Sequence, residues 1–405
     1  MIDWRVPLSD VSFGEAEERA ALRVLRGGWL STGPETRAFE EEFAAFVGAR
    51  HAVAVANGTA ALHLALLAVG AGFGGEVVQP ATNFVAAANM TVAVGASPVF
   101  ADIVALDEPT IDPAEIERRL SPRTRAVVVM HYGGHVARMR EVRAICAARR
   151  VAVVEDACHA VGARYVDGGA PELSGRAAGA LGDAACFSFF ANKNLTTGEG
   201  GMVTTDRDDV AERVRLLRSH GMTTLSWQRH QGHASSYEVL AHGFNYRFDE
   251  VRAAVGRVQL AKLEENNRRR ARLARLYRDL LRDARGWIVP FAERGEESAH
   301  HLMVAVAPDA GARREAVASL RAARIQTSLH YPCVADFAAF CERGGAGART
   351  HDSSRRGAAE SLTDDDLSRS REFARRAITL PLFPAMTEAQ VEEVCDALSG
   401  AKVKA

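Results

Sequence analysis

The sequence lacks several features that would take it out of the ordinary class of globular proteins. Its 405 residues include only six cysteines, none in a CxxC pair, so we expect reduced, packed thiols rather than disulfides or a metal site. The sequence also lacks an excess of charge of either sign, because it contains 50 Lys and Arg residues and 51 Asp and Glu residues. This balance gives no overall electrostatic reason to bind nucleic acid or an anionic membrane.

Long apolar runs are absent as well. No segment approaches the roughly 18 apolar residues that a membrane span requires, and the first residues lack the basic and apolar pattern of a secretory signal. We therefore expect a cytoplasmic protein whose partners are small molecules.

The sequence does contain a regular alternation of helical patterns and short apolar segments. These segments span residues 51–56, 76–80, 98–103, 125–130, 151–157 and 184–190. Strands separated by helices predict a mostly parallel sheet buried on both faces, with ligands at the carboxyl ends of its strands. Long Arg-rich helices follow residue 248. We predict an α/β fold with a large domain over 1–250 and a small α+β domain over 251–405, which carries a polar insertion around 342–366.

A lysine stands in a polar loop between two apolar strands, in the run CFSFFANKNLTTGEGG. Partial burial of Lys193 would lower the pKa of its amine and free the lone pair that forms a Schiff base with an aldehyde. The alternative is a solvated loop lysine, and this run alone does not decide between them.

Two further candidates follow a strand in VVEDACHAVGA. The Asp156 carboxylate could keep a pyridine nitrogen protonated, as a cofactor of the pyridoxal type needs. His159 could lie beside such a ring. The alternatives are an N-cap for Asp156 and a core histidine for His159.

A strand, a glycine turn and a helix start read as an anion cradle in ANGTAALHLAL. Gly58 lets the backbone approach an anion, while the Thr59 hydroxyl and the first helical amides, including that of Ala60, donate to it. In PATNFVAAANM, Phe84 could stack on a planar cofactor. A plain helix cap and ordinary core packing are the respective alternatives.

In this order and spacing, these segments resemble the DegT/DnrJ/EryC1/StrS family of sugar aminotransferases, which share the fold-type I architecture of aspartate aminotransferase. The resemblance runs nearly end to end, through GFNYRFDEVRAAVGRVQL to LHYPC and ITLPLFPAMTEAQ. It implies pyridoxal phosphate as the cofactor, with pyridoxamine phosphate as its intermediate form. Lys193 then binds the aldehyde as an imine, and Asp156 pairs with the pyridine nitrogen.

The resemblance also assigns the remaining cofactor contacts. Phe84 stacks on the ring, His159 lies beside it, and Ser188 joins Gly58 and Thr59 around the phosphate. Asn245 matches an asparagine that reaches the phosphate from the neighbouring subunit. A homodimer with composite active sites follows from this match.

The implied reaction moves the amino group of L-glutamate to a keto sugar. The run KNLTTGEGG favours a nucleotide-linked 4-keto-6-deoxyhexose, and the basic loop over residues 218–233 suits a diphosphate. A keto-cyclitol, amination at C3, a sugar dehydratase and a non-catalytic regulatory homologue are the alternatives. The expected substrate contacts are Thr32, Arg229, His230, Tyr246, Arg247 and His330.

Overall fold

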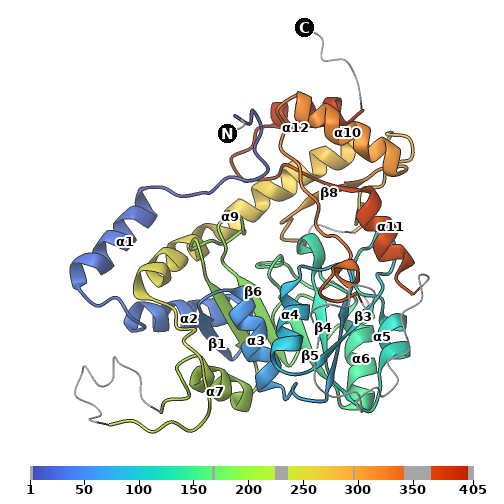
Figure 1. Cartoon of the computed structure of the whole chain (residues 1–405). Coiled ribbons are helices and arrows are strands. Elements are labelled where there is room, and N and C mark those ends of the chain that lie inside the picture. The colour runs from blue at the N-terminus through green and yellow to red at the C-terminus, as the bar shows by residue number, and fades with distance from the viewer. Residues whose placement is uncertain (1–2, 167–168, 224–235, 295–296, 342–365, 400–405) are drawn as a thin grey trace.

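The computed structural model describes residues 3–166, 169–223, 236–294, 297–341 and 366–399. In Figure 1 a long helix, α9 (Glu250–Leu281), runs diagonally from a large sheet at the bottom to a smaller group of elements at the top. Among the described helices, none is both long and apolar enough to cross a membrane.

The large sheet has seven strands in the order β1-β7-β6-β5-β4-β2-β3. Its strands are β1 (His51–Val55), β2 (Glu76–Pro80), β3 (Ser97–Ala101), β4 (Thr124–Met130), β5 (Ala152–Asp156), β6 (Ala184–Ser188) and β7 (Gly201–Thr205). Neighbours from β3 to β6 are parallel, and β7 is antiparallel to both β1 and β6. The prediction of a mostly parallel sheet is confirmed.

Helices cover both faces of this sheet. The α-helices of the whole described chain, not all of which lie on this sheet, are α1 (Glu15–Gly27), α2 (Pro34–Val47), α3 (Gly58–Ala68), α4 (Ala86–Ala93), α5 (Pro113–Arg119), α6 (Met139–Arg149), α7 (Asp208–Leu217), α9, α10 (Ala310–Ala322), α11 (Ser368–Arg376) and α12 (Glu388–Ser399). Successive β4 residues alternate between two cores: Val127 and Val129 pack with α2, α6 and α9, whereas Ala126 and Val128 pack with α3 and α7. This alternation follows from the two-residue period of a strand.

A third core lies beyond the sheet, around the two-stranded pair β8 (Met303–Val306) and β9 (Ala377–Leu380). The second half of α9 supplies Leu273 and Tyr277 to it, while the first half packs against α1 and α2. The segment before α1 also takes part, because Val6 is buried there and pairs with Ile325. The division into two domains near residue 250 stays a prediction.

The predicted lengths of four strands need correction. The strands predicted over 51–56, 98–103, 151–157 and 184–190 end earlier, at Val55, Ala101, Asp156 and Ser188. The Arg-rich region after residue 248 begins with one helix of 32 residues. The insertion predicted around 342–366 lies almost wholly outside the described residues.

A candidate active site at the carboxyl edge of the sheet

Lys193 lies in the connection between β6 and β7. The Phe189 N–H donates to the Gly200 carbonyl and the Thr197 N–H to the Phe189 carbonyl, so this connection closes as a tight loop. Lys193 is half-buried, and the completely buried Leu195 anchors the loop into the core behind it. The loop therefore holds one amine at the edge of the sheet where ligands of parallel strands bind.

Lysine is rare in this chain. Of its 50 basic residues only four are lysines, at positions 193, 262, 402 and 404. Arginine carries a permanent charge and cannot form a Schiff base, so it could not replace an amine nucleophile at position 193. This scarcity is a sequence signal for Lys193 that motif reading alone does not use.

Burial lowers the pKa of the Lys193 amine below 10.5, although Cys158 and Asp156 act in the opposite direction. A buried ammonium loses its hydration, so the neutral form gains ground. The neutral amine has the lone pair that attacks a carbonyl carbon.

Asp156 is the last residue of β5 and is buried. One of its oxygens accepts the Cys158 N–H at 3.2 Å. His159 lies one turn further on, where its Nε2 is 2.8 Å from the Tyr331 hydroxyl and its buried Nδ1 has no hydrogen-bond partner among the described residues. Burial, followed by the charge of Lys193, keeps the pKa of His159 well below 6.5, so this ring is neutral.

The turn between β1 and α3 forms a cradle of backbone amides. The Asn57 side chain accepts the Ala60 N–H at 2.8 Å, so within the described chain Gly58 and Thr59 rather than Ala60 keep free donors at the helix start. A Cβ on Gly58 would lie 2.8 Å from the Ser188 Cβ, closer than carbon atoms pack. The amides and the Ser188 hydroxyl therefore converge as an anion site requires.

Phe84 follows β2 at the same edge. Its side chain is 54% exposed, which is unusual for a large aromatic residue, and its ring centroid lies 5.9 Å from that of Tyr331. An exposed ring, an imidazole nitrogen without a partner among the described residues, an amide cradle and an amine whose pKa is lowered by burial together fit a phosphorylated aromatic aldehyde such as pyridoxal phosphate.

The predicted substrate residues differ in whether they lie near Lys193 or contact other parts of the structure. His330 lies close enough for Lys193 to affect it, and its Nδ1 is 2.9 Å from the Thr379 hydroxyl. The Thr32 hydroxyl instead donates to the Phe248 carbonyl and is buried. The Tyr246 hydroxyl is 3.2 Å from His63 Nδ1, on the side of α3. These two side chains have structural partners that the sequence did not reveal.

Asn245 and Arg247 flank Tyr246. Asn245 is exposed, as a residue that reaches a neighbouring subunit would have to be, and Arg247 is half-buried. The predicted contacts Arg229 and His230 lie outside the described residues. Arg218, counted with them as part of a basic loop, is buried and pairs with Glu40, so it is not available to a diphosphate.

Sequence reasoning missed three residues of the site. His301 Nε2 lies 3.4 Å from Lys193 Nζ, and the other ring nitrogen of His301, Nδ1, lies 3.0 Å from Asn194 Oδ1. Tyr331 joins His159 to Phe84. The one available signal was the pair of histidines in SAHHL, just before β8, which the strand pattern alone did not mark as part of a site.

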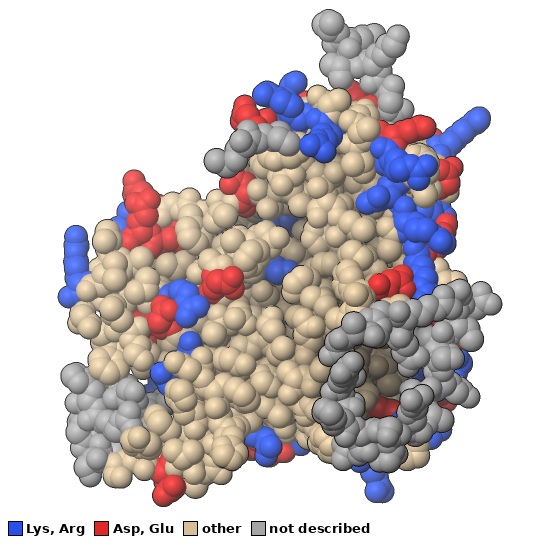
Figure 2. Space-filling view, viewed as in Figure 1, with Lys and Arg blue, Asp and Glu red and all other residues tan. Residues whose placement is uncertain are grey.

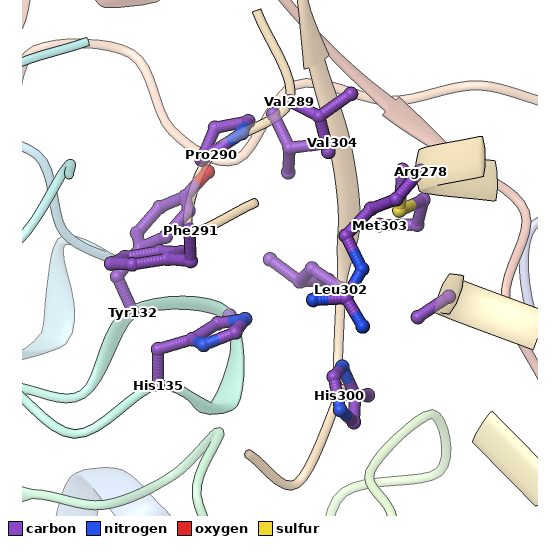
Figure 3. A pocket seen from close by; sticks show the side chains of 12 residues that line it. Tyr132, His135, Arg278, Val289, Pro290, Phe291, His300, Leu302, Met303 and Val304 are labelled. Atoms are coloured by element: carbon purple, nitrogen blue, oxygen red, sulfur yellow. The ribbon is translucent and has the colours of Figure 1, made fainter. Parts of the chain in front are cut away.

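A small cavity lies behind this edge. Its volume is about 30 Å³, room for a water molecule, and Figure 3 shows Phe291 and His135 on one side with His300 and Arg278 on the other. Burial lowers the pKa of His300 to about 4. His300 thus faces this cavity, while the next residue, His301, faces Lys193.

Figure 2 shows how charge is distributed over one face of the described residues. Basic side chains gather at its right-hand side, near α11, with acidic side chains among them, and much of the centre is uncharged.

Known proteins resemble the chain over nearly its full length. It is 37% identical over 400 residues to the spore coat polysaccharide biosynthesis protein SpsC of Bacillus subtilis, covering 97% of this chain and 96% of SpsC. The structure of S. venezuelae DesV has a TM-score of 0.83 and 34% identity, covering 98% of both chains. DesI, solved in the presence of its TDP-sugar product, has a TM-score of 0.80 and 29% identity, covering 96% of this chain and 90% of DesI.

A family model also matches residues 12–399, a range that contains every element of the site described above. With its half-buried lysine at the carboxyl edge of an α/β sheet, the chain belongs to the DegT/DnrJ/EryC1/StrS aminotransferase family and is an aminotransferase.

Proposed function

We propose that this chain uses pyridoxal phosphate to transfer the amino group of L-glutamate to a nucleotide-linked keto sugar. The observation that carries the proposal is the convergence of a half-buried amine with a lowered pKa, Lys193, with Asp156 and the Gly58 cradle at one edge of the sheet. No other described lysine lies in such a setting, since Lys262 is on α9, paired with Glu17.

Each residue then has a distinct task. Pyridoxal phosphate supplies an aldehyde that carries the amino group and a ring that takes up electrons. Asp156 pairs with the ring nitrogen, the amides of Gly58 and Thr59 bind the phosphate together with Ser188, and the exposed Phe84 ring supports the cofactor plane.

Lys193 is the residue that would hold the cofactor covalently, because its Nζ can form an imine with an aldehyde. Once released from that link, the same Nζ would be the base that takes up and returns a proton, first for glutamate and then for the keto sugar.

A nucleotide sugar is the substrate class that the comparisons favour. DesI was solved with a TDP-sugar product, and SpsC is named for polysaccharide biosynthesis. We therefore expect amination of a nucleotide-linked 4-keto-6-deoxyhexose in the assembly of an aminosugar, by a homodimer.

The first prediction concerns the covalent link. Borohydride reduction of the protein loaded with pyridoxal phosphate, followed by peptide mapping, is expected to find the cofactor on Lys193. Lys262 serves as an internal control and is expected to stay unmodified. Replacement of Lys193 by Ala is expected to abolish transamination, whereas Lys262→Ala is expected to leave it intact.

The substrate is tested separately, with nitrogen-labelled glutamate and a panel of keto sugars and keto-cyclitols. Label in the 4-amino product of a nucleotide-linked hexose supports the proposal. Label in a cyclitol or at C3 instead would replace the proposed substrate, and cofactor on Lys193 without any amine transfer would contradict an aminotransferase role.

A further inference from the structure

Four side chains from three parts of the sequence form one series of hydrogen bonds that ends at Lys193. Asn267 on α9 donates from Nδ2 to the Val161 carbonyl at 3.0 Å. Its Oδ1 accepts from Asn194 Nδ2 at 2.8 Å. Asn194 Oδ1 faces His301 Nδ1 at 3.0 Å, and His301 Nε2 faces Lys193 Nζ at 3.4 Å.

Backbone carbonyls determine which atom donates and which accepts in each of these hydrogen bonds. Val161 contributes a carbonyl that can only accept, so Asn267 must point its NH₂ group there and its oxygen toward Asn194. Both hydrogens of Asn194 Nδ2 are in turn used, one by Asn267 and the other by the Ala299 carbonyl at 2.6 Å. Asn194 therefore has only its oxygen left for His301.

The tautomer of His301 follows from this assignment of donors and acceptors. Because Asn194 Oδ1 accepts, His301 Nδ1 carries the hydrogen and its Nε2 lone pair faces the lysine. The imidazole is buried and stacks obliquely on His159, with ring centroids 4.4 Å apart. Burial, followed by the charges of Lys193 and His159, keeps the pKa of His301 well below 6.5, which agrees with a neutral ring.

We propose that His301 is a positioning residue for the reaction: its Nε2 accepts a hydrogen bond from Lys193 Nζ and holds the freed lysine in place for proton transfer, with Asn194 and Asn267 fixing the imidazole. This inference rests on the proposed role of Lys193. The hydrogen bonds among these four side chains belong to the folded protein, so they can be tested without the cofactor.

Several charged or titratable groups face Lys193 or His301 and would contribute to any pH effect. They are Asp156 at the end of β5, Cys158 and His159 in the turn that follows, His330 beside Thr379 of β9, and Arg270 on α9. Variants at position 301 leave all of these in place, so a change between two such variants isolates the imidazole.

The tautomer is measured first, on the cofactor-free full chain. Nitrogen NMR with ring-labelled histidine is expected to show one histidine with hydrogen on Nδ1, and this signal is expected to vanish in His301→Leu. A hydrogen on Nε2 of His301 instead would overturn the proposal, because the lone pair would then face away from the lysine.

The lysine is measured next, through the pH dependence of its labelling by acetic anhydride in the cofactor-free chain. His301→Leu removes the acceptor at similar volume, so the ammonium loses a stabilising partner. We expect its labelling midpoint to move about one pH unit lower. His301→Gln restores an acceptor oxygen at similar reach and is expected to keep the midpoint near that of the wild type.

Kinetics of the loaded enzyme then separate positioning from packing. His301→Leu is expected to lower kcat about tenfold with little change in KM, and His301→Gln to recover most of the loss. His300→Leu is the matched control, because it makes the same substitution one residue away and faces the small cavity instead. Equal labelling and kinetics for the Leu, Gln and wild-type chains would show that His301 does not act on Lys193.

Discussion

At the scale of single residues, burial is the common cause of the chemistry at this edge. It lowers the pKa of Lys193, His159 and His301, and so favours uncharged nitrogen at all three positions. Neutral imidazoles can accept hydrogen bonds, and a neutral amine can act as nucleophile and base. The carboxylate of Asp156 is the opposite charge that limits this effect on the lysine.

Gly58 gives a prediction at the same scale. Gly58→Ala would place a methyl group 2.8 Å from the Ser188 Cβ and push the two sides of the cradle apart. We expect the affinity for pyridoxal phosphate, measured by spectroscopic titration of the cofactor-free chain, to fall about tenfold or more, for an overpacking cost of about 1–3 kcal/mol.

Gly72→Ala is the control for this experiment. A Cβ there meets nothing nearer than the Val94 carbonyl at 3.9 Å, so affinity is expected to stay unchanged. Unaltered cofactor affinity in Gly58→Ala would contradict the cradle.

Some of these residues could be found from the sequence, and others could not. Lys193 and Asp156 each lie where a strand has just ended, so strand patterns alone bring them to the same edge. His301 comes 108 residues after Lys193, and only the packing of β8 beside the lysine loop brings them together. Thr32 could not be placed either, because its partner, the Phe248 carbonyl, is 216 residues away.

At the scale of elements, Glu155 connects β5 to the segment that follows β4 and to the segment that precedes β6. Its completely buried carboxylate accepts hydrogen bonds from His131, which follows β4, and from the N–H groups of Gly179, Leu181 and Gly182. Burial raises the pKa of Glu155, but these hydrogen bonds outweigh it and hold the pKa below 4.5. The carboxylate thus fixes β5, and with it Asp156, from the opposite side.

This arrangement predicts a pH-dependent stability. Because the folded-state pKa of Glu155 is depressed, its contribution is present above about 4.5 and is lost as the pH falls through the lower folded value. Glu155→Gln keeps one acceptor oxygen but replaces the other by an NH₂ group, which would face a donor instead of accepting from it. We expect it to cost about 2 kcal/mol at neutral pH in urea unfolding, and less below pH 4.5.

Glu264→Gln, on the exposed side of α9, is the matched control and is expected to change nothing. A deficit of Glu155→Gln that stays constant down to acid pH would contradict the depressed pKa.

Element boundaries show a similar limit of sequence reasoning. Apolar residues continue past the ends of β5 and β6 into Ala157 and Phe189, so the predicted strands were too long. Both residues are buried, and each still makes one backbone hydrogen bond to a neighbouring strand or its end, so hydrophobicity does not mark where the strand stops.

At the scale of the whole molecule, the fold class followed from the alternation of strands and helices, and the resemblance extended it to the family. The antiparallel β7 is the feature that alternation alone does not predict, since it connects to β6 through the short lysine loop. The homodimer stays a prediction, because it is a property of two chains, and exposed Asn245 is the residue that we expect to link it to the site.

A complementation experiment tests this link. Lys193→Ala and Asn245→Ala chains are each expected to be nearly inactive as homodimers. If each site takes Lys193 from one subunit and Asn245 from the other, a mixed dimer has one intact site, and co-expression should restore about a quarter of the wild-type activity. Activity no higher than that of the single variants would show that both residues act within one subunit.

The pairing of Val6 with Ile325 has a consequence for how the polypeptide is made. The seven strands are complete once residue 205 has left the ribosome, but the third core needs both Val6 and the helix that ends at Ser399. The segment around Val6 must therefore wait for its partner until residue 325 has been made. The contact between His301 and Lys193 likewise forms only after residue 301 has been made, well after the seven strands.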